Sequence, residues 1–327
     1  MPSASVVIPT YNRAASLRRT LEGLALHEPV EGGFEVVVVS DGSTDDTDRV
    51  LDQTAYRFEL VALNQENAGP AAARNRGVAA ASGRVVVFID DDTVPDRHLL
   101  NAHLRHHGGE EDAVVVMGPM LTPPDHVMTP WVAWEQAKLE AHYAALGSGR
   151  LVATARQFYT GNASVNRRRL LDSGGFDVSF RRAEDVELAY RLADRGASFV
   201  FDPEAIVLHY AERTLPAWLD VARSYGHYDT VISREKGRGW LLDAIASEFH
   251  DRHALVQLAT RATVTHPALA AATATVLTSG ARIAALIGLD RLSRSALSGA
   301  YNVTYYAGMA AELGGGKALI ERFDRGR

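Results

Sequence analysis

The chain has 327 residues, of which 46% are hydrophobic and 23% are charged. This is an ordinary balance for a globular protein that forms one large domain or two smaller ones. A net charge of −6 gives no electrostatic reason to expect a nucleic-acid partner. The absence of cysteine excludes disulfides and thiolate metal sites and agrees with a reducing compartment. The chain begins without the basic and apolar pattern of a signal peptide, so we expect a cytoplasmic protein.

The first hundred residues alternate strand-like and helix-like segments joined by short connections. We expect strands at residues 5–8, 34–39, 58–63 and 85–89, and helices at 16–26, from 44 or 45 towards 56, and at 70–81. Pro9 should end the first strand. Repeated strand–helix units with nearly continuous apolar strands predict an α/β fold whose mostly parallel sheet is covered by helices on both faces. Ligands bind beyond the carboxyl ends of strands in such sheets, so Tyr11, Asp41 and the residues after Ile89 should converge on one rim.

After residue 96 the pattern becomes mixed, and helices dominate from residue 215 onward. We expect a helix at 96–107, a strand at 113–117, a helix that opens with Thr129 and Pro130, and strands at 199–201 and 205–208. Pro at the first helical position after a capping residue is a typical helix start. These patterns predict an α/β domain over residues 1–214 and a helical region over residues 215–327.

One apolar segment, residues 268–289, is long enough to span a membrane. It consists mostly of Ala and Thr and contains Gly280, Arg282 and Gly288. An arginine inside a membrane costs roughly 2.5 kcal/mol or more on insertion scales. We therefore expect a packed or interfacial helix, which leaves open a peripheral contact between the C-terminal helices and the inner face of a membrane.

Three adjacent carboxylates, Asp90, Asp91 and Asp92, follow the strand expected at 85–89. Their mutual repulsion favours a site that also holds positive charge. Mg²⁺ is usually bound by one or two carboxylates together with phosphate oxygens, so a cation bridging to a phosphorylated ligand is one interpretation. The alternative is a solvated acidic turn.

Five sequence blocks, in the order and at the spacing found here, resemble the family 2 glycosyltransferases. The blocks are VVIPTYNR at 6–13, SDGSTD at 40–45, NAGPAAARN at 67–75, FIDDD at 88–92 and RRAEDVEL at 181–188. The resemblance covers residues 4–210. It implies a Rossmann-like GT-A fold, a nucleotide-sugar donor, a Mn²⁺ or Mg²⁺ cofactor and inversion at the anomeric carbon. Residues 1–95 would then be the nucleotide-binding half and residues 96–214 the acceptor-binding half.

The first four blocks carry the implied donor site. The resemblance assigns the metal to Asp92 and the ribose and sugar hydroxyls to Asp90 and Asp91. It assigns a pyrimidine N–H to Asp41, because a carboxylate accepts a charge-assisted hydrogen bond well. Uridine is favoured, although Ser40 stands where the family commonly has a second acidic residue. The remaining residues of the implied nucleotide-sugar site are Pro9, Thr10, Tyr11, Arg13, Gly69 and Arg74.

The fifth block carries the implied catalytic residues. Asp185 would be the general base that removes the proton of the acceptor hydroxyl, and Glu184 would orient it or bind acceptor hydroxyls. The alternative is that both carboxylates only complement the dipole at the start of a helix. His209 is a second candidate metal ligand or a structural histidine. Trp131 and Trp134 could stack on a sugar, although core packing is the commoner role, and the arginines at 167–169, 181 and 182 could hold phosphate or form a solvated basic face.

We therefore expect an inverting, metal-dependent glycosyltransferase of the hexosyltransferase type. It would move a sugar from a nucleoside-diphosphate sugar, UDP favoured, to a hydroxyl of a carbohydrate, a lipid-linked or another acceptor, in polysaccharide, cell-wall or other glycoconjugate synthesis. One alternative is a sugar-phosphate nucleotidyltransferase, although the Gly-rich basic loop typical of that class is missing after the first strand. The other is a non-catalytic module that binds nucleotide sugars. The sequence leaves a homo-oligomer open.

Overall fold

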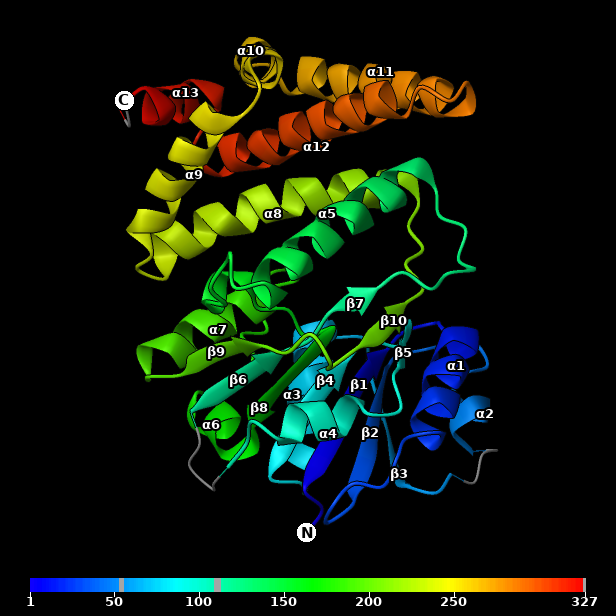
Figure 1. The fold of residues 1–327 in the computed structure, drawn as a ribbon. Coiled ribbons are helices and arrows are strands. Elements are labelled where there is room, and N and C mark those ends of the chain that lie inside the picture. Colours follow the sequence, from blue (N-terminus) through cyan, green and yellow to red (C-terminus); the bar gives the residue numbers. More distant parts are fainter. Residues whose placement is uncertain (53–55, 109–112, 326–327) are drawn as a thin grey trace. The chain divides into compact units, whose positions relative to one another are not determined.

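A computed structural model describes residues 1–52, 56–108 and 113–325 of the chain (Figure 1). The described chain divides into two compact units. The first contains Met1–His126 and Gln136–Ala211, and the second contains Val127–Glu135 and Glu212–Arg327. The first unit is α/β and the second is helical, while the boundary at residue 214 and the division into two functional halves stay predictions.

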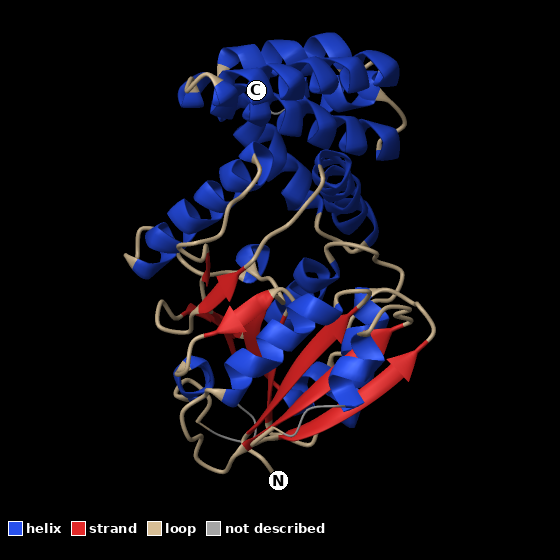
Figure 2. Cartoon of the chain, turned by 90° about the vertical axis from the view of Figure 1, so that its right-hand side faces the viewer, coloured by secondary structure: helices blue, strands red, loops and turns tan. Residues whose placement is uncertain are grey.

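A seven-stranded sheet forms the centre of the α/β unit, in the order β3-β2-β1-β4-β8-β6-β9. The strands are β1 (Ala4–Thr10), β2 (Phe34–Asp41), β3 (Glu59–Gln65), β4 (Val85–Ile89), β6 (Val114–Met117), β8 (Asn162–Asn166) and β9 (Ser198–Phe201). Strands β3, β2, β1 and β4 are parallel, whereas β8 runs antiparallel between β4 and β6. The mostly parallel sheet expected from the sequence is confirmed, and Figure 2 shows its strands with helices against them.

A second, smaller sheet lies in the same unit. Its three strands are β5 (Thr93–Pro95), β10 (Val207–His209) and β7 (Met120–Leu121). Strand β10 starts two residues later than the strand expected at 205–208, and its antiparallel register pairs His209 with Thr93. This pairing places His209 beside the chain that follows the acidic run.

Pro9 lies inside β1, so the prediction that it ends this strand is wrong. Strand β1 pairs with β2 up to Thr10 but with β4 only up to Val7. The missing N–H of a proline is therefore tolerated where one of the two neighbouring strands has already separated. The extra length carries Thr10 to the rim of the sheet.

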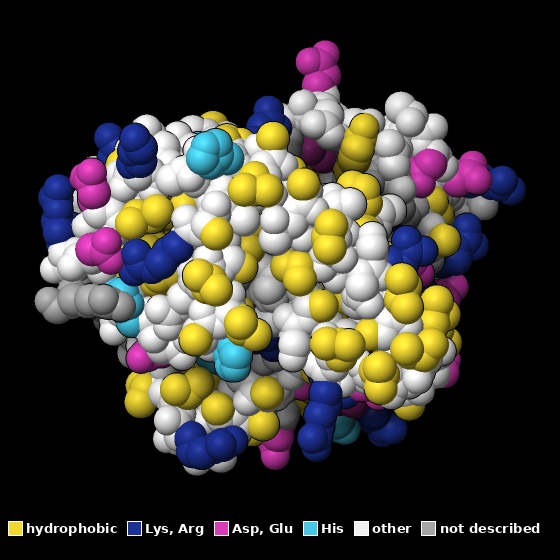
Figure 3. All heavy atoms as spheres, turned by 90° about the horizontal axis from the view of Figure 1, so that it is seen from above, with side chains coloured by type: hydrophobic (Ala, Val, Ile, Leu, Met, Phe, Trp, Pro, Cys, Tyr) yellow, Lys and Arg dark blue, Asp and Glu magenta, His cyan; other side chains and the backbone are white. Residues whose placement is uncertain are grey.

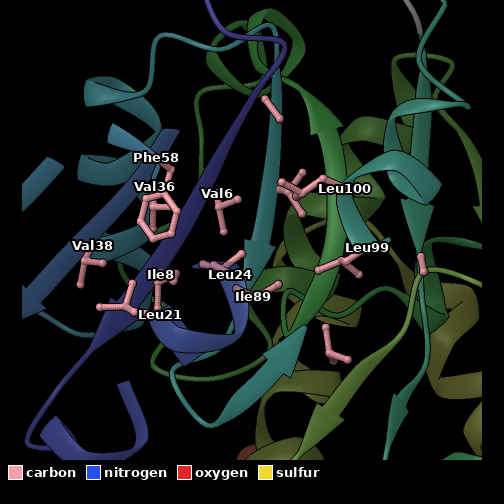
Figure 4. Close-up of a cluster of buried hydrophobic side chains, with 14 of the residues drawn as sticks. Val6, Ile8, Leu21, Leu24, Val36, Val38, Phe58, Ile89, Leu99 and Leu100 are labelled. Carbon is pink, nitrogen blue, oxygen red and sulfur yellow. The ribbon is translucent and has the colours of Figure 1, made fainter. Parts of the chain in front are cut away.

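Helices cover both faces of the sheet. The helices α1 (Ala14–Ala25), α2 (Thr47–Asp52) and α4 (Leu99–Leu104) pack on one face, where Leu21, Leu24 and Leu99 belong to one buried apolar cluster with Val6 and Val36 (Figure 4). The helix α3 (Pro70–Ala80) lies on the other face, so closely that a Cβ on Gly77 would come within 2.5 Å of Val7.

The remaining helices described in the α/β unit are α5 (Pro130–Gly147) from Gln136 onward, the 3₁₀ turn η1 (Ala155–Gln157), α6 (Arg167–Asp172) and α7 (Glu184–Asp194). Helix α4 is shorter than the helix expected at 96–107. Helix α2 starts near Asp45 as expected, but residues 53–55, through which it was expected to continue, lie outside the described residues.

The helical unit contains α8 (Leu215–Glu235), α9 (Gly239–Asp251), α10 (Ala254–Thr263), α11 (Pro267–Leu286), α12 (Asp290–Glu312) and α13 (Gly316–Arg325), and the first turns of α5 (Pro130–Gly147). Helices α8 and α12 cross with backbones in contact, because a Cβ on Gly226 would lie 1.9 Å from the carbonyl oxygen of Tyr305. Trp134 is 8% exposed and packs edge-on against Trp218 at 5.6 Å, while the indole of Trp131 donates to the carbonyl of Arg213. Both tryptophans therefore have a packing role in this unit.

Candidate active site

The rim of the sheet gathers polar residues from three neighbouring strands. Thr10 ends β1, Asp41 ends β2, and Asp90 to Asp92 directly follow β4. Because these strands are adjacent and parallel, their carboxyl ends meet at one edge. The hydroxyl of Thr10 donates to Oδ2 of Asp91 at 2.7 Å, across 81 residues of sequence. The structure therefore brings the first and fourth sequence blocks into direct contact.

Arg13 pairs with two of the three consecutive aspartates. Its Nη1 lies 2.5 Å from Oδ2 of Asp92 and 3.3 Å from Oδ1 of Asp91. Burial opposes the charge of Arg13, but attraction to Asp92 and Asp91 outweighs it and raises the pKa of Arg13 above its usual value. Burial raises the pKa of Asp91 to about 7, Arg13 partly offsets this, and the neighbouring Asp92 adds to it. The side chain of Asp91 is 8% exposed, whereas that of Asp90 is 35% exposed.

Asp41 organises the turn that leads into α3. Its carboxylate accepts hydrogen bonds from Nε2 of Gln65 at 2.7 Å, from the backbone N–H of Ala68 at 2.9 Å and from that of Gly69 at 2.8 Å. Gly69 has a φ of +92°, a conformation that glycine adopts without strain, and a Cβ there would lie 2.8 Å from Nη1 of Arg181. A carboxylate offers about four lone-pair sites, so these three bonds leave one acceptor position of the 5% exposed Asp41 unused.

Two loops of the rim are joined by hydrogen bonds of residues that were not predicted to belong to the site. The side-chain oxygen of Asn12 accepts from the N–H of Thr44 at 2.7 Å, and the N–H of Asn12 donates to the hydroxyl of Ser43 at 3.0 Å. Asp45 accepts from the N–H of Ala14 at 2.9 Å at the start of α1. The left-handed φ of +53° at Asn12 is a local signal of such a turn. These bonds fix the positions of Tyr11, which is 50% exposed, and Arg13.

Arg74 connects the acidic run to the start of α7. It lies on α3 with a side chain only 7% exposed, and it binds Oδ1 of Asp90 at 2.9 Å and Oε1 of Glu184 at 2.7 Å. Burial opposes its charge, but Asp90 and Glu184 raise the pKa of Arg74. From the sequence we expected this cation to face a nucleotide. In the structure it joins two carboxylates that are 94 positions apart in the sequence (90 and 184).

Asp185 lies in the first turn of α7, next to the group held by Arg74. Burial and repulsion from Glu184 raise its pKa to about 7, and attraction to Arg74 only partly offsets this. The residue before the helix, Ala183, has a φ of +59°, in the left-handed region that costs a non-glycine residue about 1–2 kcal/mol. Strain of this kind is retained where the surrounding structure needs a particular chain direction. Here it aims the first turn of α7 at the rim.

The loop before this helix, residues 173–176, is held from both sides. The side chain of Asn75 donates to the carbonyl of Phe176 at 2.8 Å and accepts from its N–H at 2.7 Å. Arg191 donates to the carbonyls of Ser173 and Gly175 at 2.6 and 2.7 Å while it pairs with Glu187. Asn75 and Arg191 were not predicted as site residues. Both bind backbone groups of this loop, which have no sequence signal, and Asn75 is far from the loop in the sequence.

Two of the five arginines proposed to hold phosphate lie in different places. Arg167 donates to the carbonyls of Val78 and Ala79 at 3.1 and 3.2 Å, which joins the start of α6 to α3. Arg181 lies beside Gly69 at the rim. Gly161 is a further close approach, since a Cβ there would lie 3.0 Å from Oδ2 of Asp90.

Asp92 and His209 are the pair that would hold a divalent cation. Oδ1 of Asp92 lies 3.6 Å from Nε2 of His209, and each side chain is 14% exposed. This separation leaves both atoms without a good mutual hydrogen bond, so they can serve a cation. Among the described residues no group of three or more His, Asp or Glu side chains is arranged for a metal. The donor set therefore fits a cation that takes its other ligands from a diphosphate, as Mg²⁺ commonly does.

The charge balance of the rim supports the same conclusion. Six carboxylates face three guanidinium groups there: Asp41, Asp90, Asp91, Asp92, Glu184 and Asp185 against Arg13, Arg74 and Arg181. The excess of negative charge contributes to the raised pKa values of Asp91 and Asp185. A bound cation would reduce this excess.

Comparison with known proteins establishes the family. The model of glycosyl transferase family 2 matches residues 5–175, more than half of the chain. The chain belongs to this family. It is 31% identical over 228 residues to the "Pre-mycofactocin glycosyltransferase" of Mycobacterium tuberculosis, an alignment that covers 68% of this chain and 46% of the relative. The family 2 chain spans about half the length of the curated relatives it matches.

Two solved structures resemble this family 2 chain over most of its length. The mannosyltransferase PcManGT from Pyrobaculum calidifontis, in complex with GDP-Man and Mn²⁺, aligns with a TM-score of 0.61 at 23% identity and covers 91% of this chain and 86% of its own. S. aureus TarS 1–349 in complex with UDP-GlcNAc aligns with a TM-score of 0.56 at 19% identity and covers 94% and 90%. These similarities confirm the GT-A fold.

Proposed function

We propose that this family 2 protein is an inverting, metal-dependent glycosyltransferase of the hexosyltransferase type. It takes the sugar from a nucleoside-diphosphate sugar and transfers it to an acceptor hydroxyl, with Asp185 as general base. The observation that carries the proposal is the bridge from Asp90 through Arg74 to Glu184, which places Asp185 beside the acidic rim. A base with a pKa near the working pH is suited to proton transfer, and burial and Glu184 raise that of Asp185 to about 7.

The residues of the chain divide the work between donor and acceptor. Asp185 accepts the proton of the attacking hydroxyl, and Arg74 holds the neighbouring Glu184 in place. Inversion follows when that hydroxyl attacks the anomeric carbon from the side opposite to the departing diphosphate. Asp92 and His209 would hold Mn²⁺ or Mg²⁺, which when bound supplies Lewis-acid stabilisation to the negatively charged leaving group.

The donor base is proposed to be uracil. One acceptor position of Asp41 is available to a base N–H, and the exposed ring of Tyr11, with Pro9, would flank the base. Thr10 and Arg13 position Asp91 and Asp92, while Asp90, the most exposed of the three aspartates, would reach a ribose or sugar hydroxyl. The two similar structures contain GDP-Man and UDP-GlcNAc, so guanine is the competing base to test.

The acceptor is proposed to be a hydroxyl of a carbohydrate or of a lipid-linked glycan, in polysaccharide, cell-wall or other glycoconjugate synthesis. Arg181, beside Gly69 at the rim, supports an acceptor or donor with phosphate groups. We place this reaction on the cytoplasmic side, where the absence of cysteine suits a reducing environment.

A transfer assay tests the proposal. Purified protein is incubated with UDP- and GDP-sugars, Mn²⁺ and a panel of glycoside acceptors, and nucleoside diphosphate release is measured together with the product's anomeric configuration. We expect release that depends on the acceptor and stops in excess chelator. Pyrophosphate release from sugar phosphate and nucleoside triphosphate would instead establish a nucleotidyltransferase. Binding of UDP-sugars without transfer or hydrolysis would establish a non-catalytic module.

A further inference from the structure

The helical unit carries an exposed apolar face on three consecutive helices. Large apolar side chains that are 47–70% exposed mark it on α10, on α11 and the residue that follows it, and at the start of α12: Leu258, Leu269, Val276, Ile283, Ile287 and Leu292. We call these six residues the outer face. Figure 3 looks onto this side of the molecule, where apolar side chains gather in the centre and charged ones lie mostly towards the edges. Single exposed apolar residues are ordinary, but a group of this size marks an interaction surface.

Helix α11 presents most of its large residues outward and its small ones inward, although Leu277 packs against the core of the helical unit. Leu269, Val276 and Ile283 recur every seven residues, which is close to two helical turns and places them on one side. The buried side of α11 consists of small residues, namely Ala270, Ala274, Thr278, Ala281 and Ala284. A surface helix of a soluble protein normally buries its large apolar residues and exposes polar ones. The reversed arrangement in α11 therefore fits an apolar environment outside the protein.

The charge around the outer face distinguishes between two possible apolar partners, a second copy of the chain and a lipid bilayer. Residues 252–300 contain five arginines and one aspartate, a net charge of +4, whereas the whole chain carries −6 and the remainder therefore −10. Of these arginines, Arg261 pairs with Asp324 of α13. Arg282, Arg291 and Arg294 are exposed on α11 and α12. In a symmetric dimer through this face the same arginines would meet one another. A surface that combines an apolar layer with negative headgroups complements both features.

We propose that the outer face docks on an anionic lipid bilayer, with α11 lying in the plane of the interface. Helix α11 is long and apolar enough to cross a membrane. However, its inner side packs in the core of the helical unit with Trp218 and Leu297, so it presents only one side to lipid. Amphipathic helices of this kind insert their apolar side at the level of the headgroups, with arginine next to them. The proposal does not depend on the proposed catalytic function.

Vesicle sedimentation tests the proposal with the full chain. Vesicles of phosphatidylcholine alone are compared with vesicles that contain about 30% phosphatidylglycerol, as an anionic surface. We expect the wild type to bind to the anionic vesicles. The combined variant Leu269→Gln, Val276→Gln and Ile283→Gln should bind at least about tenfold more weakly. We expect Arg291→Gln with Arg294→Gln to remove the preference for anionic lipid, as high salt should.

Matched variants separate docking from folding. Glutamine is a good helix former, and the three replaced side chains are 47%, 70% and 61% exposed, so the thermal unfolding of the triple variant should match that of the wild type. Leu26→Gln, Val127→Gln and Leu171→Gln change side chains of similar exposure elsewhere and should leave vesicle binding intact. The proposal is overturned if the wild type binds neither vesicle or if the folded triple variant binds equally well. A dimer in light scattering that the triple variant dissolves would overturn it in favour of a second copy.

Discussion

Individual residues of the rim depend on two arginines for their charge state. Arg13 pairs with Asp91 and Asp92, and Arg74 pairs with Asp90 and Glu184. Asp185, next to these groups, makes no ion pair of its own among those that the structure describes at the rim. Its raised pKa therefore results from burial and from Glu184, and the predictions at this scale concern these groups.

Asp185→Asn should reduce kcat by about 10²–10⁴, because positioned general-base catalysis typically contributes that much. In the wild type, kcat/KM should rise with pH and level off above about pH 7, the value to which the pKa of Asp185 is raised, since only the ionised carboxylate accepts a proton. Transfer assays between about pH 5 and 9 measure both effects. A variant that folds and keeps the wild-type rate would contradict the assignment.

The same substitution should stabilise the protein above neutral pH. The pKa of Asp185 is higher in the folded chain, about 7, than its ordinary value of 3.8, so the folded state loses stability as pH rises between these values. Asparagine carries no charge to bury. The melting temperature of Asp185→Asn should therefore exceed that of the wild type at about pH 8, and the difference should shrink towards about pH 4. An equal difference at both pH values would argue against the raised pKa.

Arg74→Met should destabilise the fold by about 3–5 kcal/mol, since it leaves Asp90 and the buried Glu184 without their common partner. Arg74→Lys should retain the charge but lose one of the two contacts, because an ammonium group lacks the planar fork of a guanidinium. Urea unfolding measures the loss of stability. Arg76→Met, on the exposed side of the same helix, is the control and should change stability by less than about 0.5 kcal/mol. Similar losses in both methionine variants would show that Arg74 has no special role.

At the scale of elements, α4 holds the antiparallel strand β8 through buried histidine. The ring of His103 lies 2.9 Å from Oδ1 of Asn162 and 3.0 Å from the hydroxyl of Ser164, and His107 lies 2.9 Å from the same hydroxyl. Burial lowers the pKa of His103 to about 4. The ring of His103 is therefore neutral in the folded state. Its hydrogen bonds hold β8 between the two parts of the sheet.

This contact should make the fold sensitive to acid. The pKa of His103 is about 4 in the folded chain and 6.5 in the reference state. As pH falls from 6.5 to 4, the unfolded chain therefore binds a proton before the folded chain does, and the folded state loses stability. The loss at pH 5 should be about 2 kcal/mol from this group. His103→Gln should reduce the pH dependence of urea unfolding in this range. His98→Gln, an exposed position of the same segment, should not. A pH dependence unchanged by His103→Gln would exclude this origin.

Several elements follow from sequence patterns, and others do not. Strand β4 has the predicted bounds, and helices α5 and α8 begin at Pro130 and Leu215 as expected, because their apolar runs and capping residues act locally. The prediction that Pro9 ends β1 was wrong, because its place in the strand depends on the residue at which β4 stops pairing with β1. Helix α4 was predicted too long, since the polar residues on either side of it give no local signal for where the helix begins and ends.

At the scale of the whole molecule, ligand binding should report on the donor site. A ligand at about 100 times its dissociation constant stabilises a folded protein by about 2.7 kcal/mol, so UDP with Mn²⁺ should raise the melting temperature by several degrees. Removal of Mn²⁺ should abolish most of this increase, because the proposed cation would link the diphosphate of UDP to Asp92 and His209. Asp92→Asn should melt at the wild-type temperature without ligand and respond only weakly to UDP with Mn²⁺. The same response with and without metal would contradict the proposed cation.

The sequence alone determined that acidic and polar blocks follow successive apolar strands, and parallel strands must bring such blocks to one rim. It also indicated the family through five blocks in order. Only the tertiary structure decided that Arg74 joins Asp90 to Glu184, because this pairing spans 110 residues and depends on how α3 and α7 pack. The same holds for the outward side of α11: composition shows an apolar helix, but the packing of its small residues decides which large side chains face outward.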